Sequence, residues 1–193
     1  PPLQPTPPQQ KIFLIIRLPP RYTHTQSRRH RQMCIRDRLW AAQGETHPNG
    51  YRATPSAGAL YPLEVYLVVG DVAGLPAGIY RYRPAKHDLI QLGTADLRRE
   101  LASAAHGQSY MQTAAAVLVI TGVYERTRKK YGRRARRYVH MEVGLAAENV
   151  YLQAQARGLG TLLIGAFDDE RVQGVLGLPD DHEPLGLMPL GPG

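Results

Sequence analysis

A long amphipathic helix is the feature of this sequence that most constrains the fold. Between residues 137 and 157, small or branched apolar side chains recur at steps of three and four positions: Val139, Val143, Ala146, Val150 and Ala154. This spacing gives an α-helix one apolar stripe, which any fold of the chain has to bury. Gly158 follows directly and predicts the end of the helix.

Strands dominate the rest of the expected elements. We predict strands over residues 63–69, 78–83, 89–92, 116–123, 161–166 and 185–190, and helices over 95–105 and 168–176, with 39–44 as the last turn of another helix. Residues 78–89 alternate and then turn, which favours antiparallel pairing. Asp168 is placed to cap the helix that follows it. The mixture predicts an α+β domain rather than a regular series of βαβ units.

The first 38 residues differ in composition from the rest of the chain. They hold seven of the 16 prolines and eight lysines or arginines against a single acid, Asp37. Such a segment buries too little apolar surface to offset the entropy of ordering it. Residues 27–38 also resemble a translated sequencing adapter, although a natural basic linker has the same character. We therefore expect residues 1–38 to be a non-native or disordered segment, and residues 39–193 to be a folded domain truncated at both ends.

The net charge of +8 is concentrated in that first segment. Beyond residue 38 the chain has 16 basic and 15 acidic residues, so the expected domain is nearly neutral, which argues against a nucleic-acid partner. The apolar runs are too short for a membrane span, and the single cysteine, Cys34, allows no internal disulfide. These features favour a cytoplasmic protein with neither a nucleic acid nor a membrane as partner.

Familiar cofactor and metal motifs are missing from the sequence. No Gly-x-Gly-x-x-Gly follows a predicted strand, and there is no P-loop. The histidines have no metal-ligand spacing with cysteine, so we predict no metal site.

A run of small residues precedes the strand predicted at 63–69. Pro55 favours an extended backbone before it, and Ser56, Ala57 and Gly58 keep the following side chains short. A flat ligand could approach the main chain closely there. On local chemistry alone, a helix cap and a tight turn are the simpler interpretation.

The densest charge beyond residue 38 lies at residues 126–138, which contain eight lysines or arginines. The cluster indicates either a patch for phosphate groups or an acidic partner, or only a solvated loop and helix start. Lys130 stands beside Tyr131 there, and a lysine whose pKa is lowered by burial can do acid–base chemistry.

A second junction that could face a ligand lies at residues 161–169, where an apolar stretch runs into a predicted helix. Backbone N–H groups at such a junction can face a ring or an anion, although a plain strand-to-helix loop looks the same.

Taken in order, these segments resemble the SagB-type dehydrogenase branch of the FMN-dependent nitroreductase superfamily. The resemblance covers roughly residues 39–193 and rests on an ordered set of short motifs: PSAGALYPLEVY at 55–66, GIYRY at 78–82, KYGR at 130–133, RYVHME at 137–142, NVYL at 149–152, GLG at 158–160 and IGAFDD at 164–169. The chain departs from the family pattern at Leu145 and Glu148, where the family often has histidine and glutamine.

The resemblance implies a nitroreductase-like fold, with a central mixed, mostly antiparallel sheet flanked by helices. It also implies a homodimer with two FMN sites at the subunit interface. The residues that would lie against the flavin ring are Pro55, Ser56, Ala57 and Gly58 on one side, and Ile164, Gly165 and Ala166 on the other, with a backbone N–H near flavin N5.

Members of this branch that modify ribosomal peptides oxidise thiazoline or oxazoline rings to azoles. By resemblance, Lys130 and Tyr131 are the catalytic pair, and one of them removes a ring proton while hydride leaves for the flavin. The substrate would be a peptide or a small molecule, and the resemblance also allows a complex with a cyclodehydratase. Two alternatives stay open: an NAD(P)H-dependent reductase of small molecules, and a non-catalytic basic binding module or scaffold.

Overall fold

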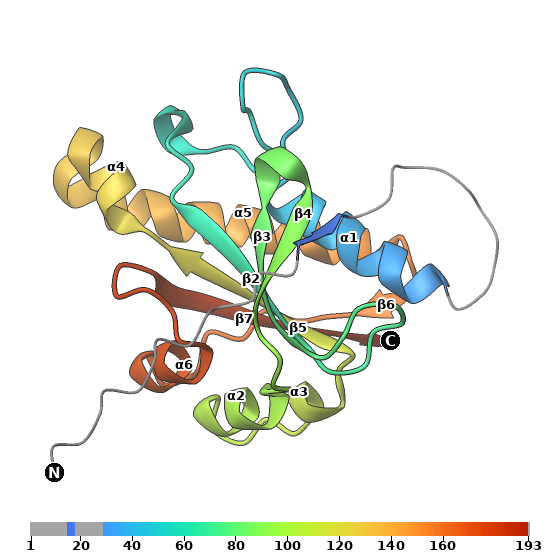
Figure 1. Ribbon diagram of the computed structural model, residues 1–193. Helices are drawn as coiled ribbons and strands as arrows, with labels where there is room; N and C mark the ends of the chain where they lie inside the picture. The colour runs from blue at the N-terminus through green and yellow to red at the C-terminus, as the bar shows by residue number, and fades with distance from the viewer. Residues whose placement is uncertain (1–14, 18–28, 193) are drawn as a thin grey trace, which may run out of the picture.

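An antiparallel sheet forms the centre of the protein, whose computed structural model describes residues 15–17 and 29–192 (Figure 1). The strands lie in the order β1-β4-β3-β2-β5-β7-β6, and every pairing between these named strands is antiparallel. Their bounds are β1 Ile15–Arg17, β2 Leu63–Val69, β3 Gly78–Arg83, β4 Asp88–Gly93, β5 Ala116–Gly122, β6 Leu159–Gly160 and β7 Glu183–Pro192.

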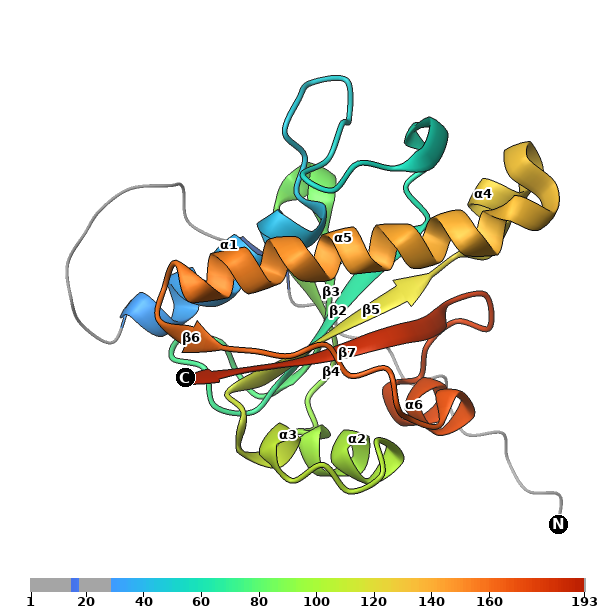
Figure 2. The same ribbon diagram turned by 180° about the vertical axis from the view of Figure 1, so that it is seen from behind.

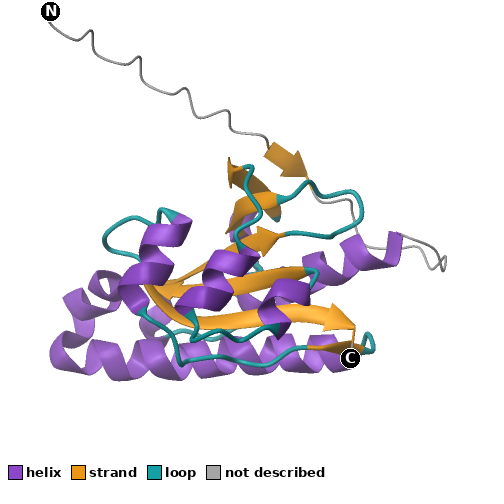
Figure 3. Cartoon of the chain, turned by 90° about the horizontal axis from the view of Figure 1, so that it is seen from below, coloured by secondary structure: helices purple, strands orange, loops and turns teal. Residues whose placement is uncertain are grey.

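Helices cover both faces of this sheet. They are α1 Arg29–Gln43, α2 Arg98–Ala104, α3 Tyr110–Thr113, α4 Tyr124–Tyr131, α5 Ala135–Gln155 and α6 Asp169–Leu176, with short 3-10 turns at Ala57–Ala59, Pro84–Lys86 and Gly132–Arg134. Figures 1 and 2 show α1 and α5 on one face and α2, α3 and α6 on the other, and Figure 3 shows α5 running along the strands. The predicted α+β class, with a mostly antiparallel sheet flanked by helices, is confirmed.

Strand β2 shows how the sequence builds a core on each face. Successive side chains of a strand point to opposite faces, so a continuous apolar run is buried on both sides. One core joins the odd-numbered residues of β2 to α1 and α5: Leu63, Val65, Leu67 and Val69 pack with Leu39, Ala42, Val139 and Val143. The other joins the even-numbered residues to α2, α3 and α6: Tyr66 and Val68 pack with Leu101, Met111 and Val172.

The long helix follows the predicted stripe closely. All five residues of the stripe are buried, and the helix begins and ends two residues before the predicted bounds. Gly158 takes a φ of +62°, a left-handed backbone that favours glycine, and so the chain turns away from the helix there.

The cap predicted for the last helix is present. The Asp168 carboxylate accepts a hydrogen bond from the backbone N–H of Arg171 at 3.0 Å. We expect Asp168→Ala to lower the free energy of unfolding by about 1 kcal/mol, because the first turn of α6 loses its acceptor. Urea unfolding of the variant measures this, with Asp169→Ala as the control, which removes an acid from the same turn but leaves the cap. Equal losses in the two variants would argue against the cap.

The strand predicted over residues 161–166 is wrong. The structure has only the two-residue β6 at Leu159–Gly160 and a single bridge at Ile164, whose backbone exchanges hydrogen bonds of 2.9 and 3.0 Å with Leu187. Leu162 is exposed, so the apolar run that suggested a strand is not buried as a whole. Between β6 and α6, the chain pairs with the sheet only through the bridge at Ile164.

Several elements of the structure differ from the predicted ones in their bounds or were not predicted. Helix α1 begins at Arg29, so the boundary expected between residues 38 and 39 falls inside it, and Ile35 contributes to the buried core. Residues 1–14 and 18–28 of the expected disordered segment lie outside the described residues. Helix α4 occupies much of the basic cluster, where only a loop and a helix start were considered, and α3 and β1 were not predicted.

Candidate functional site

The turn that carries Pro55, Ser56, Ala57 and Gly58 leads into β2 and stands beside α4 in Figures 1 and 2. Gly58 has a φ of +64°, and the Ser56 hydroxyl accepts a hydrogen bond from the Tyr61 N–H at 2.9 Å, which closes the turn. Both Gly58 and Pro55 are exposed, so the turn presents small groups outwards.

A buried carboxylate on α5 holds the turn from the inside. The Ala57 N–H donates to Glu142 Oε1 at 2.9 Å, and Glu142 is only 5% exposed. Burial raises the pKa of Glu142, although hydrogen bonds from the Ala57 N–H and the Ser56 hydroxyl and the charge of Arg52 act in the opposite direction. Our sequence analysis assigned no role to Glu142. The available signal was an acid among the apolar positions of the helix stripe, between Val139 and Ala146.

We expect Glu142→Gln to change the pH dependence of stability. Because the pKa of Glu142 is raised in the folded state, its protonated carboxyl stabilises the wild type when the pH is below the ordinary pKa near 4.5. That stabilisation is lost as the pH rises through the raised pKa. Glutamine keeps an acceptor for the Ala57 N–H and does not titrate. The free energy of unfolding of the variant minus that of the wild type should therefore increase from pH 4 to pH 8. Urea titrations at each pH measure this difference.

Glu142→Ala is the comparison for that experiment. It leaves the Ala57 N–H without its acceptor, so we expect a loss of about 1–3 kcal/mol at every pH. A constant difference between the wild type and Glu142→Gln over this pH range would contradict the raised pKa.

Lys130 and Tyr131, at the end of α4, lie against Gly58. A Cβ atom added to Gly58 would come within 2.8 Å of the Tyr131 hydroxyl and 2.9 Å of Lys130 Nζ. The Lys130 ammonium lies 5.5 Å from the centre of the Tyr131 ring, and the ring of Tyr138 meets Tyr131 edge-on at 5.0 Å. The structure therefore brings three of the predicted site residues together, from segments more than 70 positions apart in the sequence.

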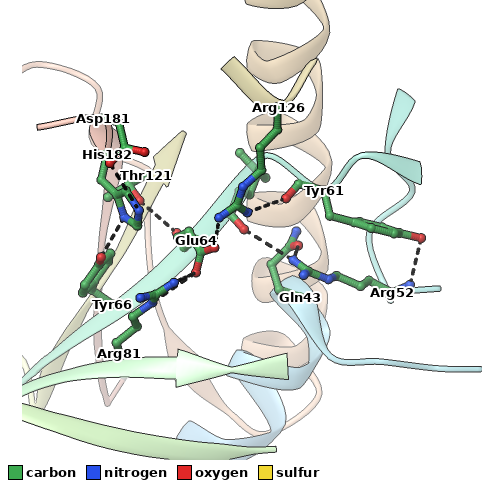
Figure 4. A network of polar contacts seen from close by, with 11 residues as sticks. Gln43, Arg52, Tyr61, Glu64, Tyr66, Arg81, Thr121, Arg126, Asp181 and His182 are labelled. Atoms are coloured by element: carbon green, nitrogen blue, oxygen red, sulfur yellow. Dashed lines mark hydrogen bonds and ion pairs between the residues drawn. The ribbon is translucent and has the colours of Figure 1, made fainter. Parts of the chain in front are cut away.

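An ion-pair network anchors the first turn of α4 to the sheet (Figure 4). Glu64, buried on β2, accepts a hydrogen bond from Arg126 Nη2 at 2.6 Å on one oxygen and from Arg81 Nη2 at 3.1 Å on the other. Burial opposes the charge of Glu64, but the hydrogen bonds from Arg126 and Arg81 outweigh it and hold its pKa below the usual range. On the same strand, Tyr66 shares a hydrogen bond of 2.7 Å with His182.

The other residues predicted to contact the flavin ring lie beside β7. Ile164 is buried and paired with Leu187, while Gly165 and Ala166 are exposed. Among the described residues, no hydrogen bond or ion pair joins these three to the turn at Pro55–Gly58 or to Lys130 and Tyr131. Among the described residues, the two halves of the predicted site are therefore not joined by a hydrogen bond or an ion pair within one chain.

A hollow of about 660 Å³ lies on another side of α4, and none of the predicted site residues lines it. Its walls combine arginines with acids: Arg128, Arg133 and Arg136 with Glu125, Asp181 and Glu183, beside Tyr124, Gly132 and Ala135. The charges of this lining balance, so the hollow does not show the one-sided potential expected of a phosphate site.

Two further findings concern the part of the chain that the structure describes. No helix there is long and apolar enough to span a bilayer. No group of three or more His, Cys, Asp or Glu side chains is arranged to hold a metal ion.

Comparisons with known proteins agree with this fold. Residues 35–192 match the family described as the Nitroreductase family. A protein of Methanocaldococcus jannaschii named as a nitroreductase is 46% identical over 153 residues, which are 79% of this chain and 76% of that protein. A crystal structure of an Anabaena variabilis protein, also named as a nitroreductase, superposes with a TM-score of 0.84 at 28% identity; it covers 94% of this chain, which spans 39% of that one.

A third similarity is to the microcin B17-processing protein McbC of Escherichia coli. It is 30% identical over 132 residues, which are 66% of this chain and 48% of McbC. The structure of the McbBCD complex with truncated pro-MccB17 bound contains a chain that matches with a TM-score of 0.73 at 27% identity, over 83% of this chain and 63% of that one.

Proposed function

The chain belongs to the nitroreductase family, whose members are oxidoreductases that generally bind FMN, and from that premise we propose an FMN-dependent dehydrogenase of the SagB type. Its reaction would be the oxidation of thiazoline or oxazoline rings in a ribosomal peptide to azoles. The observation that carries this proposal is the convergence of the Lys130 ammonium and the Tyr131 hydroxyl on Gly58. The similarity to McbC, a peptide-processing protein, supports the choice of a peptide substrate.

The turn at Pro55–Gly58 fits a flat cofactor. The polar groups of the turn make hydrogen bonds within the protein, because the Ala57 N–H donates to Glu142 and the Ser56 hydroxyl accepts from the Tyr61 N–H. The solvent-facing side of the turn is an exposed surface of small groups, with the Lys130 ammonium and the Tyr131 phenol at its rim. Gly165 offers a similar open surface, since an added Cβ would meet no atom within 4 Å. Bound FMN would supply the two-electron acceptor for the oxidation.

The contribution of the chain itself would be proton transfer and positioning. The Tyr131 hydroxyl and Lys130 Nζ both lie against Gly58 at the edge of the turn. One of the two, in its deprotonated form, would take the ring proton, while the other stabilises the ring position that has lost it. The ring of Tyr138 packs edge-on against Tyr131 and restricts its movement.

We propose that each flavin site is completed by a second copy of the chain. The outward face of α5 carries Met141, Leu145 and Leu152, which are 51%, 46% and 61% exposed at positions that share one side of the helix. Gly144 lies on that side, and a Cβ there would meet no atom within 4 Å, which allows another helix to come close. A homodimer through this face would let the turn at Pro55–Gly58 and the segment Ile164–Ala166 come from different protomers.

The same proposal includes a cytoplasmic location, where ribosomal peptides are made, and a complex with a cyclodehydratase. The McbC-like chain that matches this protein was solved inside the McbBCD complex, which supports an assembly of that kind.

The second candidate is an NAD(P)H-dependent reductase of small molecules. The 46% identity to the Methanocaldococcus jannaschii protein named as a nitroreductase favours it. This reaction would use the same cofactor surface but would run in the direction of substrate reduction.

One experiment separates the two candidates. The chain is reconstituted with FMN, separated from free flavin, and given either an azoline-containing peptide in air or a nitroaromatic compound with NADPH. Mass spectrometry detects the loss of two hydrogens from the peptide, and absorbance follows the nitro group. Peptide oxidation supports the SagB-type proposal, nitro reduction alone supports the second candidate, and a protein that retains no FMN contradicts both.

A further inference from the structure

Arg126 links α4 to the turn that the proposed function uses. Its guanidinium donates through Nη1 to the Tyr61 carbonyl at 3.0 Å and through Nη2 to Glu64 Oε1 at 2.6 Å (Figure 4). On α4, Arg126 precedes Lys130 by four positions, about one turn of helix. One planar side chain therefore joins the helix of the candidate catalytic pair to the end of the turn and to the sheet.

The Tyr61 end of this link is held in a strained conformation. Tyr61 has a φ of +46°, in the left-handed region that side chains other than glycine rarely adopt, at a cost of about 1–2 kcal/mol. Its N–H donates to Ser56 Oγ, its hydroxyl accepts from the Arg52 N–H at 3.2 Å, and the Arg52 guanidinium lies 4.7 Å above its ring. The carbonyl of Tyr61 is the group that Arg126 holds, so Arg126 contributes to keeping the turn in this shape.

The Glu64 end is a rigid support. Glu64 lies on β2, which pairs with β3 on one side and β5 on the other, and its second oxygen is occupied by Arg81. A carboxylate held by two arginines, on a strand that is paired on both sides, offers Arg126 a fixed acceptor. The guanidinium of Arg126 connects this support to the turn and to α4, because Nη1 binds the Tyr61 carbonyl and Nη2 binds Glu64.

We infer that Arg126 is a positioning residue, which sets the distance of Lys130 and Tyr131 from the turn at Pro55–Gly58. This inference rests on the proposed function for its effect on catalysis, but the positioning itself is a property of the folded chain. A lysine at this position would keep the positive charge and lose the fork, so it could not hold both the Tyr61 carbonyl and Glu64 in the same geometry.

The test compares Arg126→Lys with Arg128→Lys. Arg128 lies on the same helix, but its side chain is 72% exposed and its ion pair with Glu125 spans 3.8 Å. Amide hydrogen exchange is measured by mass spectrometry on peptides that cover residues 55–61 and 126–133, together with the melting temperature, the affinity for FMN, kcat and KM.

For Arg126→Lys we expect exchange in both peptides to rise about 10-fold or more, with a melting temperature within a few degrees of the wild type. We also expect kcat to fall about 10-fold or more, with KM and the affinity for FMN changed little, since substrate and flavin contacts are retained. Arg128→Lys should match the wild type in each measurement.

Two outcomes would overturn the inference: exchange in both peptides equal to that of Arg128→Lys, or faster exchange with an unchanged kcat. If the wild type itself turns over no substrate, the proposed function fails, and the exchange comparison still decides whether Arg126 positions the two segments.

Discussion

Lys130→Met and Tyr131→Phe should each lower kcat by about 100-fold or more while FMN stays bound, because general acid–base groups typically contribute 100-fold to 10,000-fold. Both side chains lie at the rim of the turn, next to Gly58. Hydrogen bonds to Glu142 and to Ser56 hold the turn from the inside, and both variants keep them. The measurement is kcat for the reconstituted protein, with the visible absorbance of the bound flavin recorded on the same samples.

Lys129→Met is the matched control, because Lys129 is an exposed neighbour on the same helix with the same charge. It should retain kcat close to that of the wild type. Loss of flavin from both Lys130→Met and Tyr131→Phe would assign the pair a structural role instead. If kcat fell as far in Lys129→Met as in Lys130→Met, the total charge of α4 and not the position of Lys130 would control turnover.

Leu145→Glu should convert the proposed homodimer to a monomer and weaken FMN binding about 10-fold or more. Leu145 lies at the middle of the exposed apolar side of α5, between Met141 and Leu152. In a dimer through this side, the two new carboxylates would face an apolar surface, and burial of an unpaired charge is strongly unfavourable. If each flavin site takes residues from both protomers, the monomer keeps only half of each site. Sedimentation velocity gives the oligomeric state, and quenching of FMN fluorescence gives the affinity.

Leu92→Glu provides the control for this experiment. Leu92 is an exposed leucine on β4, away from α5, and the same charge placed there should alter neither the oligomeric state nor the affinity for FMN. A monomeric Leu145→Glu variant with full FMN affinity would contradict the shared flavin site. A wild type that is monomeric at high concentration would contradict the homodimer.

Much of the architecture could be predicted because it depends on local patterns. The stripe from Val139 to Ala154 requires a helix with one buried face, and that helix was found within two residues of its predicted bounds. The runs at 63–69 and 78–83 match β2 and β3 residue by residue. Asp168 caps α6 as expected, because a cap involves only residues within three positions of each other.

Prediction failed where burial, and not local pattern, decided the outcome. The apolar run at 161–166 has the composition of a strand, yet it meets β7 only at Ile164. For the basic cluster, a solvated loop and helix start was one of two interpretations, but the cluster contains the helix α4, which Arg126 ties to Glu64 and Tyr61. The expected boundary at residue 38 rested on composition, whereas Ile35 packs into the core with the rest of α1.

The sequence by itself therefore determined the elements, their amphipathic faces and the candidates Lys130, Tyr131 and Gly58. Only the tertiary structure decided that these three meet, that Glu142 supports the turn from 85 positions away, and that Arg126 reaches Tyr61 across 65. The physical reason is range. Periodicity and caps act between residues a few positions apart, whereas a hydrogen bond to a distant segment exists only after the sheet and α5 have packed and brought the two segments together.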